Sequence, residues 1–198
     1  LRFRPARMIL IKSATIIDGT GKPPYRSDIL IKGDRISAIG NFPSKTAELV
    51  VDGLGLTLTP GFIDVNTGSD HYLSLFTNPE QQDFLLQGVT TIIGGQCGAS
   101  LAPILYGSLK SIRKWVNINQ INVNWHSIGE LKQILRKNGL GVNFATLIGH
   151  STIRRDLIGD EVRDLTDSEL DIFENLISEG MRNNALGLST GLGYIHAR

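Results

Sequence analysis

The pattern of the chain changes at Thr59-Pro60-Gly61, and this change limits the possible folds more than any other feature. Before it, aliphatic and β-branched runs are separated by turn residues, which predicts short strands joined by tight turns. After it, apolar strand-like runs alternate with helical patterns, which predicts βαβ units and a parallel sheet. The sequence therefore predicts a small β module over residues 8–60 and an α/β region over residues 61–198.

The predicted β module contains strand-like stretches at residues 9–17, 29–39 and 49–58. Turn residues that include Asp18-Gly19 and Gly33-Asp34 punctuate them. Residues 1–7 are basic and precede Met8 at the start of the first strand, and the apolar run that follows is short and interrupted by Lys12. This is not the pattern of a signal peptide, so we leave residues 1–7 unassigned as an N-terminal extension.

The α/β region contains four predicted strands, at residues 62–65, 89–93, 142–148 and 185–189. Helices are predicted between them from capping signals: Asn78 with Pro79 and a closing Gly88, Ser127 with Glu130, and Thr166 with Glu169. Such units form either a (β/α)₈ barrel or an open doubly wound sheet. A barrel needs roughly 250 residues and eight strands, so four βα units make a partial barrel at most.

The composition excludes several classes of partner. The 20 basic and 19 acidic residues are interspersed and give a net charge of +1, so no strong field is expected to hold nucleic acid or an acidic membrane. The single cysteine cannot form an internal disulfide, and no apolar stretch has the length of a membrane span. These features favour a cytoplasmic protein.

Small and polar residues follow each predicted strand of the α/β region. They occupy residues 66–70, 96–98, 149–151 and 189–191. Because the carboxyl ends of parallel strands meet at one rim, where active sites of such folds lie, we expect these four segments to converge.

The sequence resembles the D-aminoacylase branch of the amidohydrolase superfamily from Met8 to Tyr194. The matching segments are residues 59–64, 87–91 and 95–98, Trp125, Gly149-His150 with Arg154, and residues 185–192 with Tyr194. The resemblance implies a small β-sandwich, to which both chain ends contribute, and a distorted (β/α)₈ barrel that holds zinc. It also implies a hydrolase of linear amide C–N bonds that acts on N-acyl-D-amino acids.

The resemblance assigns Cys97 as a metal ligand, in an enzyme whose metal-bound water attacks the amide carbonyl. On general grounds a lone cysteine is more often an inert, buried small residue. Most amidohydrolases carry a His-x-His pair after the first barrel strand, whereas this chain has Asn66 and Gly68 there, and neither is a good zinc ligand. We therefore expect one zinc ion, at the Cys97 site.

The residues expected to bind substrate are Tyr194, His150 and Asp70. For Asp70 the alternative is a loop carboxylate bonded to its own backbone, and for His150 it is a ring that supports the site through a hydrogen bond. Tyr194 resembles a substrate-contacting tyrosine of the family, although by itself it would be taken for a rim aromatic. Arg154 suits a substrate carboxylate or a structural ion pair. His71 is out of register with the missing pair and is interpreted as an ordinary loop histidine.

Two further histidine ligands and the catalytic aspartate of the family would lie beyond Arg198. The resemblance therefore implies an N-terminal fragment that is inactive by itself, with its catalytic residues unknown. The absence of His-x-His leaves a second possibility, an amidohydrolase fold that only binds or scaffolds. A cyclic amidase is a third possibility, but it would be expected to keep His-x-His.

Overall fold

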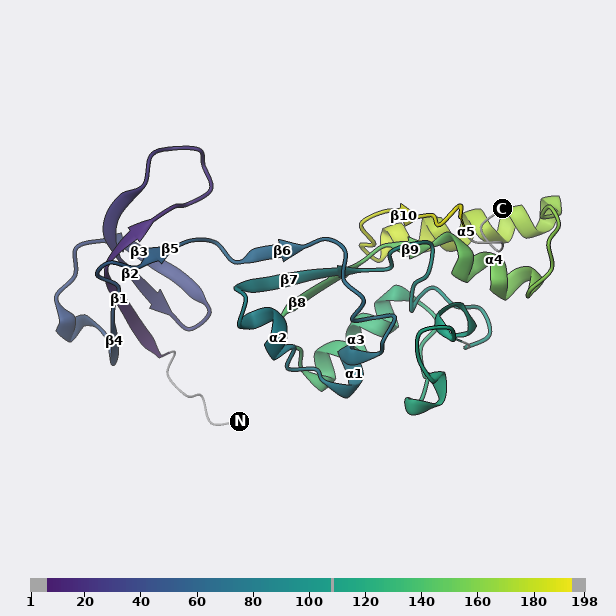
Figure 1. Cartoon of the computed structure of the whole chain (residues 1–198), viewed down its shortest axis with the longest axis horizontal. Coiled ribbons are helices and arrows are strands. Elements are labelled where there is room, and N and C mark those ends of the chain that lie inside the picture. Colours follow the sequence, from purple (N-terminus) through teal and green to yellow (C-terminus); the bar gives the residue numbers. More distant parts are fainter. Residues whose placement is uncertain (1–6, 108, 194–198) are drawn as a thin grey trace. The chain divides into compact units, whose positions relative to one another are not determined.

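The computed structural model describes residues 7–107 and 109–193, and the chain divides between Pro60 and Gly61 into two compact units. The N-terminal unit is built of strands, whereas the C-terminal unit combines strands and helices (Figure 1). The chain is therefore a mixed α/β structure, and its pattern changes at the same place as in the sequence. No helix among the described residues has both the length and the apolar character needed to cross a membrane.

The N-terminal unit is a five-stranded sheet with the order β3-β2-β1-β4, in which β5 also pairs with β1. Its elements are β1 (Met8–Ile16), β2 (Tyr25–Lys32), β3 (Arg35–Gly40), η1 (Ser44–Thr46), β4 (Leu49–Asp52) and β5 (Thr57–Leu58). β1 is antiparallel to β2 and parallel to β4 and β5. The predicted stretch 29–39 is an antiparallel pair that turns at Gly33-Asp34, where Gly33 has a φ of 64° that suits glycine.

The C-terminal unit has two groups of parallel strands, β6-β7-β8 and β9-β10. Its strands are β6 (Phe62–Asp64), β7 (Val89–Gly94), β8 (Asn143–Thr146), β9 (Ile148–Gly149) and β10 (Leu188–Ser189). The strands predicted at 62, 89 and 142 are thus confirmed and parallel. The third is interrupted at Leu147, whose N–H still donates to the Gly94 carbonyl of β7, and the fourth is reduced to β10.

Helices and short helical turns connect these strands. They are α1 (Ser74–Thr77), α2 (Gln82–Leu85), η2 (Lys110–Ile112), η3 (Ile118–Gln120), α3 (Ile128–Asn138), α4 (His150–Ile158) and α5 (Asp167–Arg182). Both predicted capping boxes are confirmed: Ser127 and Glu130 cap α3, and Thr166 and Glu169 cap α5.

The helix predicted between Asn78 and Gly88 is present in part, as α2, but its predicted start at Asn78 is wrong. Asn78 ends α1, and α2 begins only after Gln81, which has a left-handed φ of 49°. The reason is the buried Gln81 side chain, whose amide donates to the Asn78 and Ser74 carbonyls and accepts from Ser69. These bonds hold a turn between two short helices in place of one continuous helix.

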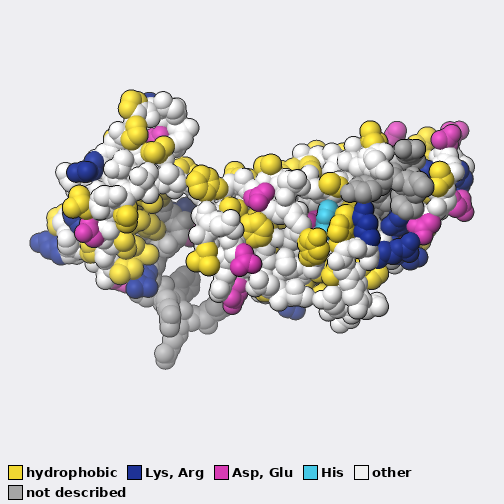
Figure 2. All heavy atoms as spheres, viewed as in Figure 1, with side chains coloured by type: hydrophobic (Ala, Val, Ile, Leu, Met, Phe, Trp, Pro, Cys, Tyr) yellow, Lys and Arg dark blue, Asp and Glu magenta, His cyan; other side chains and the backbone are white. Residues whose placement is uncertain are grey.

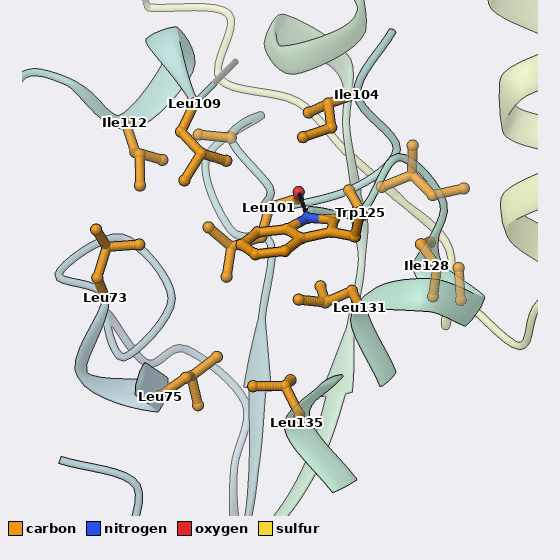
Figure 3. Packing of buried hydrophobic residues seen from close by; sticks show 14 of the residues in the cluster. Leu73, Leu75, Leu101, Ile104, Leu109, Ile112, Trp125, Ile128, Leu131 and Leu135 are labelled. Atoms are coloured by element: carbon orange, nitrogen blue, oxygen red, sulfur yellow. Dashed lines mark hydrogen bonds between the residues drawn. The ribbon is translucent and has the colours of Figure 1, made fainter. Parts of the chain in front are cut away.

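Trp125 lies at the centre of the apolar core of the C-terminal unit (Figure 3). Its side chain is 1% exposed, its ring stacks on Phe76 at 5.2 Å, and its indole N–H donates to the Leu101 carbonyl at 2.7 Å. Figure 3 shows Leu131 of α3 beside this ring and Leu135 of the same helix further from it. Trp125 therefore attaches the irregular stretch 99–126 to α3.

Candidate active site

The segment after β7 is the meeting point of the strand ends. We call residues 95–99 the Cys97 loop. The Gln96 side chain donates to the Val65 carbonyl after β6 at 2.5 Å, and the Gly98 N–H donates to Ser189 Oγ of β10 at 3.1 Å. The Gly98 carbonyl accepts from the Thr152 N–H of α4, directly after β9, at 3.2 Å. The predicted convergence of the four polar segments is confirmed by these bonds.

Close packing explains why this loop is rich in glycine. A Cβ on Gly95 would lie 2.3 Å from the Leu147 carbonyl oxygen, and a Cβ on Gly98 would lie 2.8 Å from Ser151 Oγ. Both glycines also have φ near +77°, a conformation that other residues rarely adopt. Ser189 holds the loop at two points, since its Oγ donates to the Gly95 carbonyl and accepts from Gly98. The loop therefore has one defined path between the strand ends.

Cys97 lies at the middle of this loop with a left-handed φ of 55°, and its side chain is exposed. The structure thus does not place it in the core, where an inert cysteine would lie. Within residues 7–107 and 109–193, no group of three or more His, Cys, Asp or Glu side chains could hold a metal ion. Cysteine sulfur is a type of ligand that suits zinc, but a zinc site needs at least two more protein ligands.

Asp70 is fully buried and bonded to the Cys97 loop. Its Oδ2 accepts from the Gly95 N–H at 2.5 Å, and its Oδ1 accepts from the His71 N–H at 2.9 Å. Burial raises the pKa of the Asp70 carboxyl, against the opposing effects of His71 and of these N–H groups. Asp70 therefore bonds to neighbouring backbone, as one interpretation had it, but it also reaches a loop 25 residues away. Its contact with substrate stays a prediction.

His71 is not an ordinary loop histidine, so that interpretation was wrong. It is 7% exposed, and its Nε2 lies 3.0 Å from the Ala99 carbonyl oxygen. Because a carbonyl can only accept, Nε2 carries the proton in this bond. The ring stacks on Trp115 at 4.4 Å with an interplanar angle of 11°.

Lys114 is a second neighbour of the site that sequence reasoning missed. Its Nζ lies 4.0 Å from the centroid of the Trp115 ring. Burial lowers the pKa of Lys114 and the charge of Arg155 lowers it further, whereas Cys97 opposes both effects. Lys114 lies in an irregular stretch whose sequence has no periodicity, so no signal for its position was present.

His150 is the first residue of α4, a helix that the sequence did not predict. Its ring lies 5.2 Å from Phe173, and its buried Nδ1 has no hydrogen-bond partner among the described residues. Burial lowers the pKa of His150, and the charge of Arg154 lowers it further. Both effects favour the neutral form of the His150 ring, and the role of His150 in binding substrate stays a prediction.

Arg154 is 5% exposed and donates through Nη2 to the Arg163 carbonyl. It forms no ion pair with an acidic side chain in the described part of the chain. Tyr194, the remaining predicted substrate residue, lies outside the described residues.

The comparisons with known proteins point to one class, the amidohydrolases. No protein-family model matches the chain. Two solved structures of D-aminoacylase superpose on the chain with TM-scores of 0.83 and 0.84. The first is described as defining a novel subset of amidohydrolases, and the second as having a binuclear metal centre with one-metal activation. Both are 30% identical to the chain, and they cover 98% of it and 40% of their own length.

Within that class the chain resembles the N-acyl-D-amino-acid deacylases. D-aminoacylase from Alcaligenes xylosoxydans xylosoxydans is 35% identical over 94% of the chain and 38% of its own length. N-acyl-D-glutamate deacylase from Bordetella bronchiseptica, solved with zinc and a phosphonate inhibitor, is 28% identical, with a TM-score of 0.82 over 96% of the chain and 39% of its own. The chain thus spans about two fifths of the length of these relatives and resembles their N-terminal part.

Proposed function

We propose that the chain is the N-terminal part of a metal-dependent hydrolase of linear amide C–N bonds that acts on N-acyl-D-amino acids. The observation that carries this proposal is the position of Cys97: an exposed thiol in a rigid loop where four strand ends meet. The resemblance to D-aminoacylase over 94% of the chain supports the same chemistry.

The metal in this proposal is a single zinc ion for which Cys97 supplies one ligand. Asn66 and Gly68 offer no thiolate, imidazole or carboxylate, so a second ion would lack donors on this side of the site. The other ligands and the catalytic aspartate would come from chain beyond Arg198. Zinc in such a site polarises the amide carbonyl and lowers the pKa of water toward neutrality.

The chain's own residues would hold the loop and receive the substrate. Ser189 and Asp70 fix the Cys97 loop through its backbone. We propose that Tyr194 and His150 contact the substrate, because His150 begins α4 next to this loop. Asp70 is fully buried and bonded to this loop, so we propose that it acts on the substrate through the loop.

We further propose that the N-terminal unit is part of a β-sandwich and that the C-terminal unit is the first half of a (β/α)₈ barrel. Among the described residues, β6 pairs with β7 and with no other strand. Large apolar side chains are exposed along it: Phe62 is 62% exposed, Ile63 61% and Val65 61%. Hydrophobic side chains are visible on the surface of both units (Figure 2). An apolar edge strand of this kind is expected to pair with further chain.

The test uses the complete natural protein that contains these residues. We expect it to release the amino acid from N-acetyl-D-amino acids, to leave the L-forms intact, and to lose turnover when a chelator removes its zinc. The isolated 198-residue chain should be inactive. A folded, zinc-free protein that binds these compounds without cleaving them would instead support the scaffold alternative, which the missing His-x-His permits.

A further inference from the structure

We infer that Asp70 and His71 are positioning residues that clamp the two ends of the Cys97 loop and thereby fix the direction of the Cys97 side chain. Asp70 Oδ2 accepts from the N–H of Gly95, the first loop residue, and His71 Nε2 donates to the carbonyl of Ala99, the last one. Cys97 lies between these two anchors. The benefit of this clamp for amide hydrolysis rests on the proposed function.

Neighbouring structure makes each anchor rigid. The backbone turn that carries the pair is closed by bonds from Tyr72 N–H to the Gly68 carbonyl at 2.9 Å and from Leu73 N–H to the Asp70 carbonyl at 3.1 Å. The stack on Trp115 limits rotation of the His71 ring. A Cβ on Gly94 would lie 2.7 Å from Asp70 Oδ2, so the glycine at the end of β7 leaves the carboxylate room to reach Gly95.

The anchors act on a loop that would not hold its shape by itself. Cys97 has a left-handed φ of 55°, which is unfavourable for a non-glycine residue and persists only when surrounding contacts fix it. Burial of a carboxylate and an imidazole is also costly unless directed hydrogen bonds compensate, and apolar side chains would fill the same space at lower cost. The polar atoms of Asp70 and His71 are therefore explained by the bonds that they make to the loop.

The test measures amide hydrogen exchange across these residues in the complete natural protein for three variants. His71→Leu removes the donor to Ala99, whereas His71→Gln offers a side-chain N–H in its place. Asp70→Asn leaves one carbonyl oxygen for two N–H donors. Each variant keeps both Ser189 bonds to the loop. Asp171→Asn and His126→Gln change exposed residues of the same types and are the matched controls.

We expect exchange within the Cys97 loop to rise about tenfold in His71→Leu and Asp70→Asn, the factor that corresponds to loss of one buried hydrogen bond. Exchange in α3 and α5 should stay unchanged, and His71→Gln should restore protection of the loop. A role in filling space predicts instead that His71→Gln and His71→Leu behave alike. That result, or loop exchange equal to the controls in both disruptive variants, would overturn the clamp.

A variant that unfolds globally is recognised by faster exchange in α3 and α5. In that case the test is the exchange rate of the Cys97 loop in His71→Gln compared with wild type at low denaturant. In the complete protein, the same disruptive variants should lower kcat with little change in KM. An inactive wild-type protein with the expected exchange pattern would contradict the proposed function and leave the clamp supported.

Discussion

Substitution of Trp125 by phenylalanine should destabilise the C-terminal unit markedly. Phenylalanine keeps an aromatic ring against Phe76 but has no N–H to donate to the Leu101 carbonyl. Both Trp125 and Leu101 are 1% exposed, so this bond is buried. Leaving that acceptor unpaired costs about 1–3 kcal/mol. The missing part of the indole ring leaves a small cavity that costs roughly 1 kcal/mol more. The free energy of unfolding should therefore fall by about 2–4 kcal/mol.

Urea unfolding followed by circular dichroism measures this change, provided that the m-value stays constant. Trp115→Phe is the matched control, because Trp115 is only partly buried and its indole makes no hydrogen bond in the described part of the chain. The control should lose about 1 kcal/mol or less. Equal losses in the two variants would refute the argument that the Trp125–Leu101 bond joins residues 99–126 to α3.

One further substitution and one titration follow from the described contacts. Gly95→Ala should reduce the free energy of unfolding, measured in urea, by about 2–4 kcal/mol. The added Cβ would clash with the Leu147 carbonyl, and Gly95 has a positive φ that alanine rarely adopts. A loss under about 1 kcal/mol would show that the loop moves aside. Arg163 and the Thr166 N–H lower the pKa of Glu169 from 4.5 to about 2, so its contribution to stability is present above pH 4.5 and is lost as the pH falls toward 2. Carboxyl NMR titration checks this, and a Glu169 midpoint near 4.5 would contradict the observed pairing.

Local signals in the sequence located much of the fold. Both capping boxes need only residues three positions apart, so Ser127 with Glu130 and Thr166 with Glu169 could be predicted directly. Asn78 misled for the opposite reason. Its capping signal was outweighed by the buried Gln81 amide, whose partner Ser69 lies 12 residues away, and such a pairing is not visible in a local pattern.

The candidate site divides in the same way. The convergence of strand ends followed from the position of polar residues after apolar runs, whereas the choice of Cys97 as a metal ligand came from the resemblance. The contacts that shape the site are of long range: His71 reaches Ala99 over 28 residues, and Ser189 reaches Gly98 over 91. α4 was not predicted because its N-cap residue is Gly149, which has no side chain to cap the helix and so gives no capping signal in the sequence.

The most direct test of the account compares Cys97→Ala with Asn66→Ala in the complete natural protein. Zinc content is measured by elemental analysis and turnover is measured with N-acyl-D-amino acids. We predict about one zinc ion per chain in the wild type, since Cys97 is the soft donor on this side of the site. Cys97→Ala should lose both the zinc and the turnover, whereas Asn66→Ala should keep both. A Cys97→Ala protein that retains its zinc and full turnover would contradict the assignment of Cys97 as a metal ligand.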